Sequence, residues 1–194
     1  MKKFWFIIIL CAGVFFGCRS LGIRVLGVRQ HYDDLSEEEK SSVVWTQPEE
    51  HIGDVANDGR IYAISGRQLR MMIEECPRAV LYCWDPFCKS EVCVSLHHLQ
   101  RRCNEHSVKL FVVADFFFGA FTQNLALTDH PLFVKNSEVY GTDRCTPLQK
   151  LFFIDLLGDS VYNENAETFL WHRYLYFEDG KFVDVITNPD TFFK

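Results

Sequence analysis

Short apolar runs alternate with helical periodicities along most of the chain. Residues 61–64, 78–83 and 108–114 are each apolar and bounded by polar or turn-forming residues, which is typical of buried strands. Between the second and third runs, four apolar side chains recur at spacings of four, three and four. These side chains are Val92, Leu96, Leu99 and Cys103. This periodicity predicts a helix over residues 89–104.

Capping and turn signals place the remaining elements. Ser65 precedes a run with helical spacing, as an N-cap does. The sequence 146–149, Thr-Pro-Leu-Gln, combines a cap, a first-turn proline and a capping-box glutamine, and Gly158 follows the last expected turn. Asp179-Gly180 lies near the centre of residues 174–187 and predicts a hairpin there. The aromatic stretch 116–127 is ambiguous, and we expect it to be partly helical.

The order of these elements predicts an α/β fold. After the first strand come a helix, a strand, a helix, a strand, a helix and a two-stranded hairpin. Alternating strands and helices build parallel strand pairs through right-handed crossovers, and a closing hairpin adds an antiparallel edge. We therefore expect a three-layer fold, with a mixed central sheet between flanking helices.

The N-terminus predicts export from the cytoplasm. Lys2 and Lys3 precede a 13-residue apolar stretch, 4–16, which is short for a spanning helix of about 20 residues. The following Gly17-Cys18 resembles the lipobox of bacterial lipoproteins, which implies a signal peptide over 1–18 and a lipid on Cys18. The residues after Cys18 resemble those of lipoproteins sorted to the outer membrane, facing the periplasm. A signal peptide cleaved elsewhere, or an uncleaved anchor, remains the alternative.

Charge and composition limit the partners of the exported chain. Beyond residue 18 the chain carries 18 Lys and Arg against 26 Asp and Glu, a net charge of −8. No cluster of basic residues is present, so a nucleic-acid partner is not expected. Residues 19–56 show no sustained period and are expected to form a tether, followed by one domain over 57–194. Six cysteines remain, and their spacing leaves the disulfide pairing open.

A cysteine stands at the junction between the strand 78–83 and the following helix. The sequence here is Trp84-Asp85-Pro86-Phe87-Cys88, and a strand-to-helix junction favours a thiolate through backbone N–H groups and the helix dipole. The segment resembles the active-site loop of thioredoxins, which has the pattern Trp-x-x-x-Cys-x-x-Cys. The resemblance covers roughly residues 57–190. It implies a thioredoxin-like fold with an insertion around 115–165, in a lipoprotein of a bacterial (Bacteroides-type) cell envelope.

Carried over by position, the resemblance gives only part of a thioredoxin site. Cys88 matches the attacking cysteine, with Trp84 and Pro86 as its framing residues. Three other positions differ from the thioredoxin pattern. Glu91 replaces the second cysteine, Tyr82 the buried carboxylate, and His172 the cis-proline. A thioredoxin-type dithiol cycle through this loop is therefore not expected.

Two functions remain open at this point. In the first, Cys88 carries out thiol redox chemistry on protein thiols as a single cysteine, without a Cys-x-x-Cys pair. His172 would activate this thiol, and the charge of Glu91 would oppose the activation. On the predicted helix Cys93 faces away from Cys88 and is a poor resolving cysteine unless the first turn unwinds, and Cys145 is a looser candidate. In the second, the scaffold binds a protein partner without catalysis. Neither function requires a cofactor.

Three weaker patterns complete the sequence analysis. Cys93 and His97 have the i, i+4 spacing of metal ligands on a helix, but two ligands do not make a site, and we expect no metal. A rival alignment uses Pro147 as the cis-proline and residues 151–154 as the next strand. The phenylalanines at 116–118 and 121 are expected to lie in the core rather than to form a ligand cage.

Overall fold

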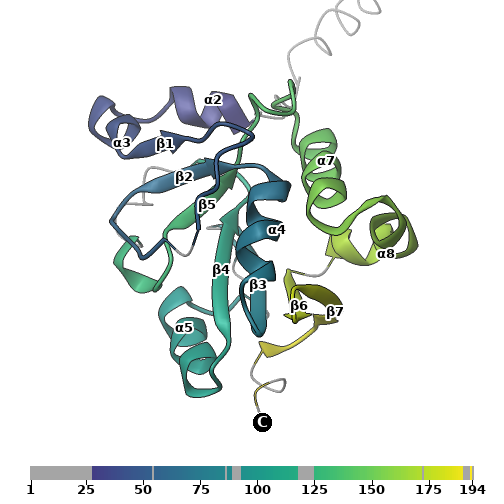
Figure 1. Cartoon of the computed structure of the whole chain (residues 1–194). Coiled ribbons are helices and arrows are strands. Elements are labelled where there is room, and N and C mark those ends of the chain that lie inside the picture. The colour runs from purple at the N-terminus through teal and green to yellow at the C-terminus, as the bar shows by residue number, and fades with distance from the viewer. Residues whose placement is uncertain are drawn as a thin grey trace, which may run out of the picture.

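In the computed structural model, a seven-stranded mixed sheet is packed between helices (Figure 1). The structure describes residues 28–53, 55–85, 87–88, 93–117, 125–171, 173–189 and 193. The strands are β1 (Val43–Trp45), β2 (Ile61–Ile64), β3 (Arg78–Trp84), β4 (Lys109–Ala114), β5 (Leu132–Lys135), β6 (Tyr174–Glu178) and β7 (Lys181–Ile186). The helices are α2 (Val28–Asp33), α3 (Glu37–Ser41), α4 (Gly66–Glu74), α5 (Leu96–Glu105), α7 (Cys145–Leu157) and α8 (Asp159–Trp171), with a 3-10 turn η1 (Leu125–Leu127). The predicted α/β class with a mixed sheet is confirmed.

The strands lie in the order β1-β2-β5-β4-β3-β6-β7. The first five positions in this order are parallel, and β6 pairs antiparallel with β3, followed by β7 antiparallel to β6. Asp179 and Gly180 join β6 to β7, and both have positive φ angles, 46° and 74°. Two successive positive φ angles are the requirement of a tight hairpin turn. The predicted hairpin is therefore confirmed.

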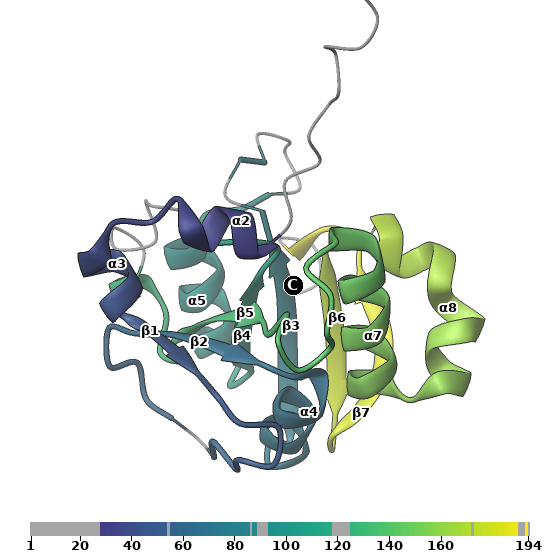
Figure 2. The same ribbon diagram turned by 90° about the horizontal axis from the view of Figure 1, so that it is seen from above.

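Helices lie on both faces of the sheet (Figure 2). Two separate apolar clusters lie between the sheet and these helices, one on each face. Successive side chains of β3 point to opposite faces of the sheet and so belong alternately to the two clusters. Val80, Tyr82 and Trp84 join the cluster to which α5 contributes. Ala79, Leu81 and Cys83 join the cluster to which α4, α7 and α8 contribute. Two faces covered by helices explain why β3 reads as one continuous apolar run.

The helix signals were right for α4 and partly right for α7. Ser65 is the N-cap of α4, as the sequence predicted, and it forms a capping box with Gln68. Helix α7 starts one residue before the expected cap, with Arg144 as an N-cap that makes no side-chain cap hydrogen bond. Gly158 ends this helix with a φ of 85°. Because residues 151–154 lie inside α7, the rival alignment that made them a strand is wrong.

The helix expected over 89–104 begins later than predicted. Helix α5 starts at Leu96, and the hydroxyl of Ser95 accepts a hydrogen bond from the His98 amide at 3.3 Å. Residues 93–95 are not helical. The apolar spacing extended the prediction across Ser95, although serine is a favoured N-cap. Cys93 and His97 therefore do not share a helix, and the metal-ligand spacing inferred for them does not apply.

Two segments expected to lie outside the sheet contribute strands to it. Residues 28–53, within the predicted tether, form α2, α3 and β1, so the sheet begins earlier in the chain than residue 57. Strand β5 comes from the expected insertion around 115–165, yet it lies between β2 and β4. Strand β1 is three residues long and the apolar run of β5 covers only residues 132–134, so neither strand was expected from the sequence. Within the part of the chain that the structure describes, no helix is both long and apolar enough to cross a membrane.

Candidate functional site

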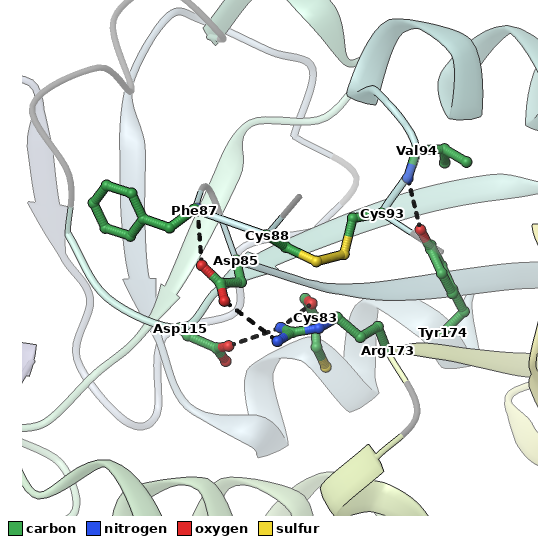
Figure 3. Close-up of a disulfide and its surroundings, with 9 residues drawn as sticks. All are labelled: Cys83, Asp85, Phe87, Cys88, Cys93, Val94, Asp115, Arg173 and Tyr174. Atoms are coloured by element: carbon green, nitrogen blue, oxygen red, sulfur yellow. Dashed lines mark hydrogen bonds and ion pairs between the residues drawn. A yellow bond between two sulfur atoms is a disulfide. The ribbon is translucent and has the colours of Figure 1, made fainter. Parts of the chain in front are cut away.

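A disulfide bond joins Cys88 to Cys93 in the segment between β3 and α5 (Figure 3). The two Cα atoms are 6.1 Å apart, and both side chains are partly exposed. We call this segment, residues 85–95, the disulfide loop. The prediction that Cys93 is a poor partner for Cys88 is wrong, because Cys93 precedes the N-cap of α5 and is not turned away by the helix. The disulfide thus joins two cysteines that are separated by four residues, whereas the resemblance to thioredoxins placed the second cysteine at position 91.

Both ends of the disulfide loop are held by local hydrogen bonds. Strand β3 ends at Trp84, which is buried, and Asp85 then turns the chain. The Asp85 carboxylate accepts a hydrogen bond from the Phe87 amide at 2.9 Å. The backbone carbonyl of Asp85 accepts one from the Cys88 amide at 3.1 Å. Such aspartate turns need only a short polar side chain. At the other end, the Ser95 cap fixes where α5 begins.

A chain of four charged side chains lies at the same edge of the sheet as the disulfide loop. The guanidinium of Arg173 lies 3.3 Å from a carboxylate oxygen of Asp85 and 3.1 Å from one of Asp115 (Figure 3). The other carboxylate oxygen of Asp115 lies 2.7 Å from the ammonium of Lys135. The four side chains alternate in sign and carry no net charge together. The sequence analysis did not identify this network.

The position of each strand explains why these charges meet. Asp85 and Asp115 directly follow the parallel strands β3 and β4, and Lys135 ends the parallel strand β5. Arg173 precedes β6, which runs the opposite way, so it starts at the same edge. The carboxyl ends of parallel strands are the usual place for sites in open α/β sheets. Polar residues directly after buried strands were the sequence signal for this cluster.

The pKa values of the central ion pair are set by opposing effects. Burial pushes the pKa of the Asp115 carboxyl upward, but Lys135 and Arg173 outweigh it and hold the pKa below its ordinary value. Burial pushes the pKa of Lys135 downward, but the Asp115 carboxylate outweighs it and holds the pKa above its ordinary value. Both groups are therefore charged at neutral pH.

Two stacked tyrosines lie on the face of the sheet that α5 covers. The rings of Tyr82 and Tyr174 are 4.4 Å apart, and the Tyr174 hydroxyl accepts a hydrogen bond from the Val94 amide at 3.4 Å (Figure 3). Val94 follows Cys93 directly, so this contact joins β6 to the end of the disulfide loop. Burial, with the neighbouring Tyr174, raises the pKa of Tyr82 far above its ordinary value. Tyr82 therefore does not supply the ionised carboxylate that a thioredoxin has at this position.

Three stacked aromatic rings lie next to Cys88. Phe87 is 53% exposed, and its ring stacks at 5.6 Å on Phe116, which in turn stacks at 4.7 Å on His31 of α2. The neighbouring Phe117 is fully buried, so the core placement expected for this cluster holds at that position. Phe118 and Phe121 lie outside the described residues. An exposed aromatic ring next to a disulfide adds apolar contact area for a partner.

The remaining cysteines differ in their access to solvent. Cys76, Cys83 and Cys103 are buried and lie outside any disulfide, and Cys145 is partly exposed at the first turn of α7. Burial raises the pKa of both Cys83 and Cys103 to about 12. Within the described ranges, no three His, Cys, Asp or Glu side chains are placed to hold a metal ion.

The other predicted site residues fall outside the described part of the chain. Four residues are in this group: Cys18, Pro86, Glu91 and His172. Their predicted roles in lipidation, framing and catalysis stay predictions. Comparison with protein-family models, curated proteins and solved structures found no match for this chain.

Proposed function

We propose that this protein is a thioredoxin-like thiol–disulfide exchange protein of the bacterial cell envelope, with Cys88 and Cys93 as its redox couple. One observation carries the proposal: a partly exposed disulfide lies between the end of a central parallel strand and the N-cap of the next helix. The proposal keeps Cys88 as the reactive thiol expected from the sequence and adds Cys93 as its resolving partner.

The order of elements supports the thioredoxin-like part of the proposal. From β2 onward, strands and helices alternate until the β6–β7 hairpin closes the sheet, as the resemblance to thioredoxins implies. The disulfide follows the strand at which that resemblance places the reactive cysteine. Strand β5 and the second helix α8 are additions to this order.

The exchange reaction balances within the couple and its substrate. The reduced protein attacks a substrate disulfide with the Cys88 thiolate, forming a mixed disulfide and releasing one substrate thiolate. The Cys93 thiolate then attacks the Cys88 sulfur, forms the Cys88–Cys93 bond and releases the second substrate thiolate. The substrate gains two electrons, and protons from solvent complete its two thiols. The reverse sequence oxidises a substrate dithiol and reduces the protein.

Trapping of the mixed disulfide tests this function. In the full chain purified in detergent, we expect Cys93→Ser to accumulate a mixed disulfide with glutathione at Cys88, detected by peptide mass spectrometry. Cys145→Ser serves as the control, because it removes a partly exposed thiol and leaves the couple intact. A wild-type disulfide that resists excess glutathione until the protein unfolds would show a structural bond and refute the proposal.

A binding module on the same scaffold is the second candidate. The exposed Phe87 ring favours it, because an apolar contact surface beside the loop does not require chemistry. The exchange function requires the sulfur atoms of Cys88 and Cys93, whereas the binding function does not. A Cys88→Ser/Cys93→Ser variant that complements a deletion strain as well as wild type would favour binding, whereas loss of complementation favours exchange.

The envelope location rests on the N-terminal sequence alone. Lys2, Lys3, the apolar stretch 4–16 and Cys18 support a lipid-anchored protein, facing the periplasm from the outer membrane. Metabolic labelling with a fatty acid tests it. We expect label on wild type and none on Cys18→Ala, and a processed Cys18→Ala protein that stays in the membrane would contradict the lipid anchor.

A further inference from the structure

Within the charged network, the guanidinium of Arg173 contacts the end of β3, the start of the disulfide loop and the residue that follows β4. Its guanidinium bonds Asp85 of the disulfide loop, Asp115 after β4, and the carbonyl oxygen of Cys83 at 3.3 Å. Its own carbonyl accepts a hydrogen bond from the Cys83 amide at 2.8 Å. Arg173 is therefore fixed to the end of β3 by both its backbone and its side chain.

The contact with Asp85 leads directly to the redox couple. One carboxylate oxygen of Asp85 accepts from Arg173 and the other accepts from the Phe87 amide. The ion pair therefore orients the same carboxylate that forms the turn before Cys88. A planar guanidinium can hold two carboxylates and a carbonyl at once, which a lysine ammonium does with poorer geometry.

We propose that Arg173 is a positioning residue for the Cys88–Cys93 couple, acting through Asp85 to favour the closed, oxidised form of the disulfide loop. The inference rests on the proposed exchange function. With the Asp85 turn held, Cys88 stays within bonding distance of Cys93, and ring closure loses less chain entropy. Without Arg173 the Asp85 turn is less constrained, and the redox equilibrium shifts toward the reduced form, in which Cys88 and Cys93 are not bonded.

The direction of the effect separates this role from a direct electrostatic one. A guanidinium that acted on the sulfur itself would stabilise the Cys88 thiolate, and its removal would make the disulfide harder to reduce. The positioning role has the opposite result: removal makes the disulfide easier to reduce.

The redox equilibrium of the full chain with glutathione tests the proposal. Two glutathione molecules reduce the Cys88–Cys93 bond to two thiols and form one glutathione disulfide, and the protein fractions are read by mass after alkylation. We expect Arg173→Ala to shift this equilibrium toward the dithiol by about five- to tenfold. Arg101→Ala is the matched control, since it removes an arginine that pairs with Glu105 on α5, away from the loop. It should leave the equilibrium constant unchanged.

Two further variants connect the effect to Asp85. Asp85→Asn keeps an acceptor for the Phe87 amide and removes the charge, and we expect a shift in the same direction. Arg173→Lys should restore only part of the wild-type constant. The double variant Arg173→Ala/Asp85→Asn should shift no further than Arg173→Ala alone, because both changes break one interaction.

The outcomes distinguish this inference from the proposed function. A shift toward the disulfide in Arg173→Ala, or strictly additive shifts in the double variant, would overturn the positioning role. Unchanged constants in all the variants would overturn it too, while leaving exchange intact. If Arg173→Ala does not fold, Asp85→Asn and Arg173→Lys decide by the same criteria. A wild-type couple that never equilibrates with glutathione would instead refute the exchange function itself.

Discussion

The ammonium of Lys135 lies 2.7 Å from the carboxylate of Asp115, and only 3% of the lysine side chain is exposed. Removal of the Asp115 carboxylate leaves the charge of Lys135 buried without this partner. We expect Asp115→Ala to lower the free energy of unfolding by about 3 kcal/mol. Lys135→Met should cost less, because Asp115 keeps Arg173 as a partner. Urea unfolding of both variants, with the disulfide intact, measures the difference, and equal losses would contradict this account.

The same ion pair predicts how stability depends on pH. The pKa of Asp115 is lowered in the folded protein, so its contribution is present above the unfolded value of about 4 and is lost as pH falls through the folded pKa. The pKa of Lys135 is raised, so its contribution is present below about 10.4 and is lost as pH rises through the folded pKa. Between pH 4 and pH 2 we expect wild type to lose more stability than Asp115→Asn. If the free energy of unfolding fell equally with pH in both proteins, the ion pair would not contribute to stability.

Alkylation should separate the cysteines into two groups. The pKa of about 12 at Cys83 and at Cys103 leaves almost no thiolate at pH 8, so we expect both to react at least about 100-fold more slowly than Cys145. Reduction should add Cys88 and Cys93 to the reactive group without exposing Cys83. Iodoacetamide labelling followed by peptide mass spectrometry measures each site. Rapid native labelling of Cys83 would show that the end of β3 opens in solution.

Gly66 lets the backbone of α4 lie close to the backbone of α7. A Cβ atom at this position would collide with the backbone carbonyl of Phe152 and would lie 2.8 Å from the amide of Leu156. Backbone atoms cannot move aside as a flexible side chain can, so Gly66→Ala should destabilise the protein by about 2–3 kcal/mol. Arg67→Ala, at the next position, is exposed and should cost under about 1 kcal/mol. Thermal unfolding of the two variants compares them directly.

Phe87 should matter for protein substrates more than for small ones. Its ring is exposed and adjoins Cys88, so a protein that approaches the disulfide would contact it. We expect Phe87→Ala to slow exchange with a reduced, unfolded protein several-fold and to leave the rate with glutathione unchanged. Val183→Ala removes an equally exposed apolar side chain, on β7, and should change neither rate. Equal slowing with both substrates would instead indicate a change in the loop.

The elements with strong local signals could be predicted from the sequence. Strands β2, β3 and β4 were expected as continuous apolar runs, and the hairpin at Asp179-Gly180 from its turn residues. The start of α5 was misplaced because Val92 happens to extend the helical spacing upstream of Ser95. Strand β5 was not expected, because its apolar run covers only residues 132–134 and the strand ends in the charged Lys135.

Only the site residues that lie close together in the sequence could be predicted. Cys88 and Trp84 were found from one short motif. The link to Cys93 depended on where α5 begins, and the link to Arg173 depended on strand pairing 88 positions away. Pairings of this kind are set by the order of the strands in the sheet, and no short stretch of the sequence indicates that order.

The central place of β5 has a consequence for how the chain folds during synthesis. Strands β1 and β2 reach the rest of the sheet only through β5, which pairs with β2 on one side and β4 on the other. Until residue 135 has been made, β2 therefore has no parallel neighbour toward the sheet centre, although it precedes β3 and β4 in the chain. We expect the N-terminal strands to stay open to proteolysis on a nascent chain that ends before β5 and to gain protection once β5 is added.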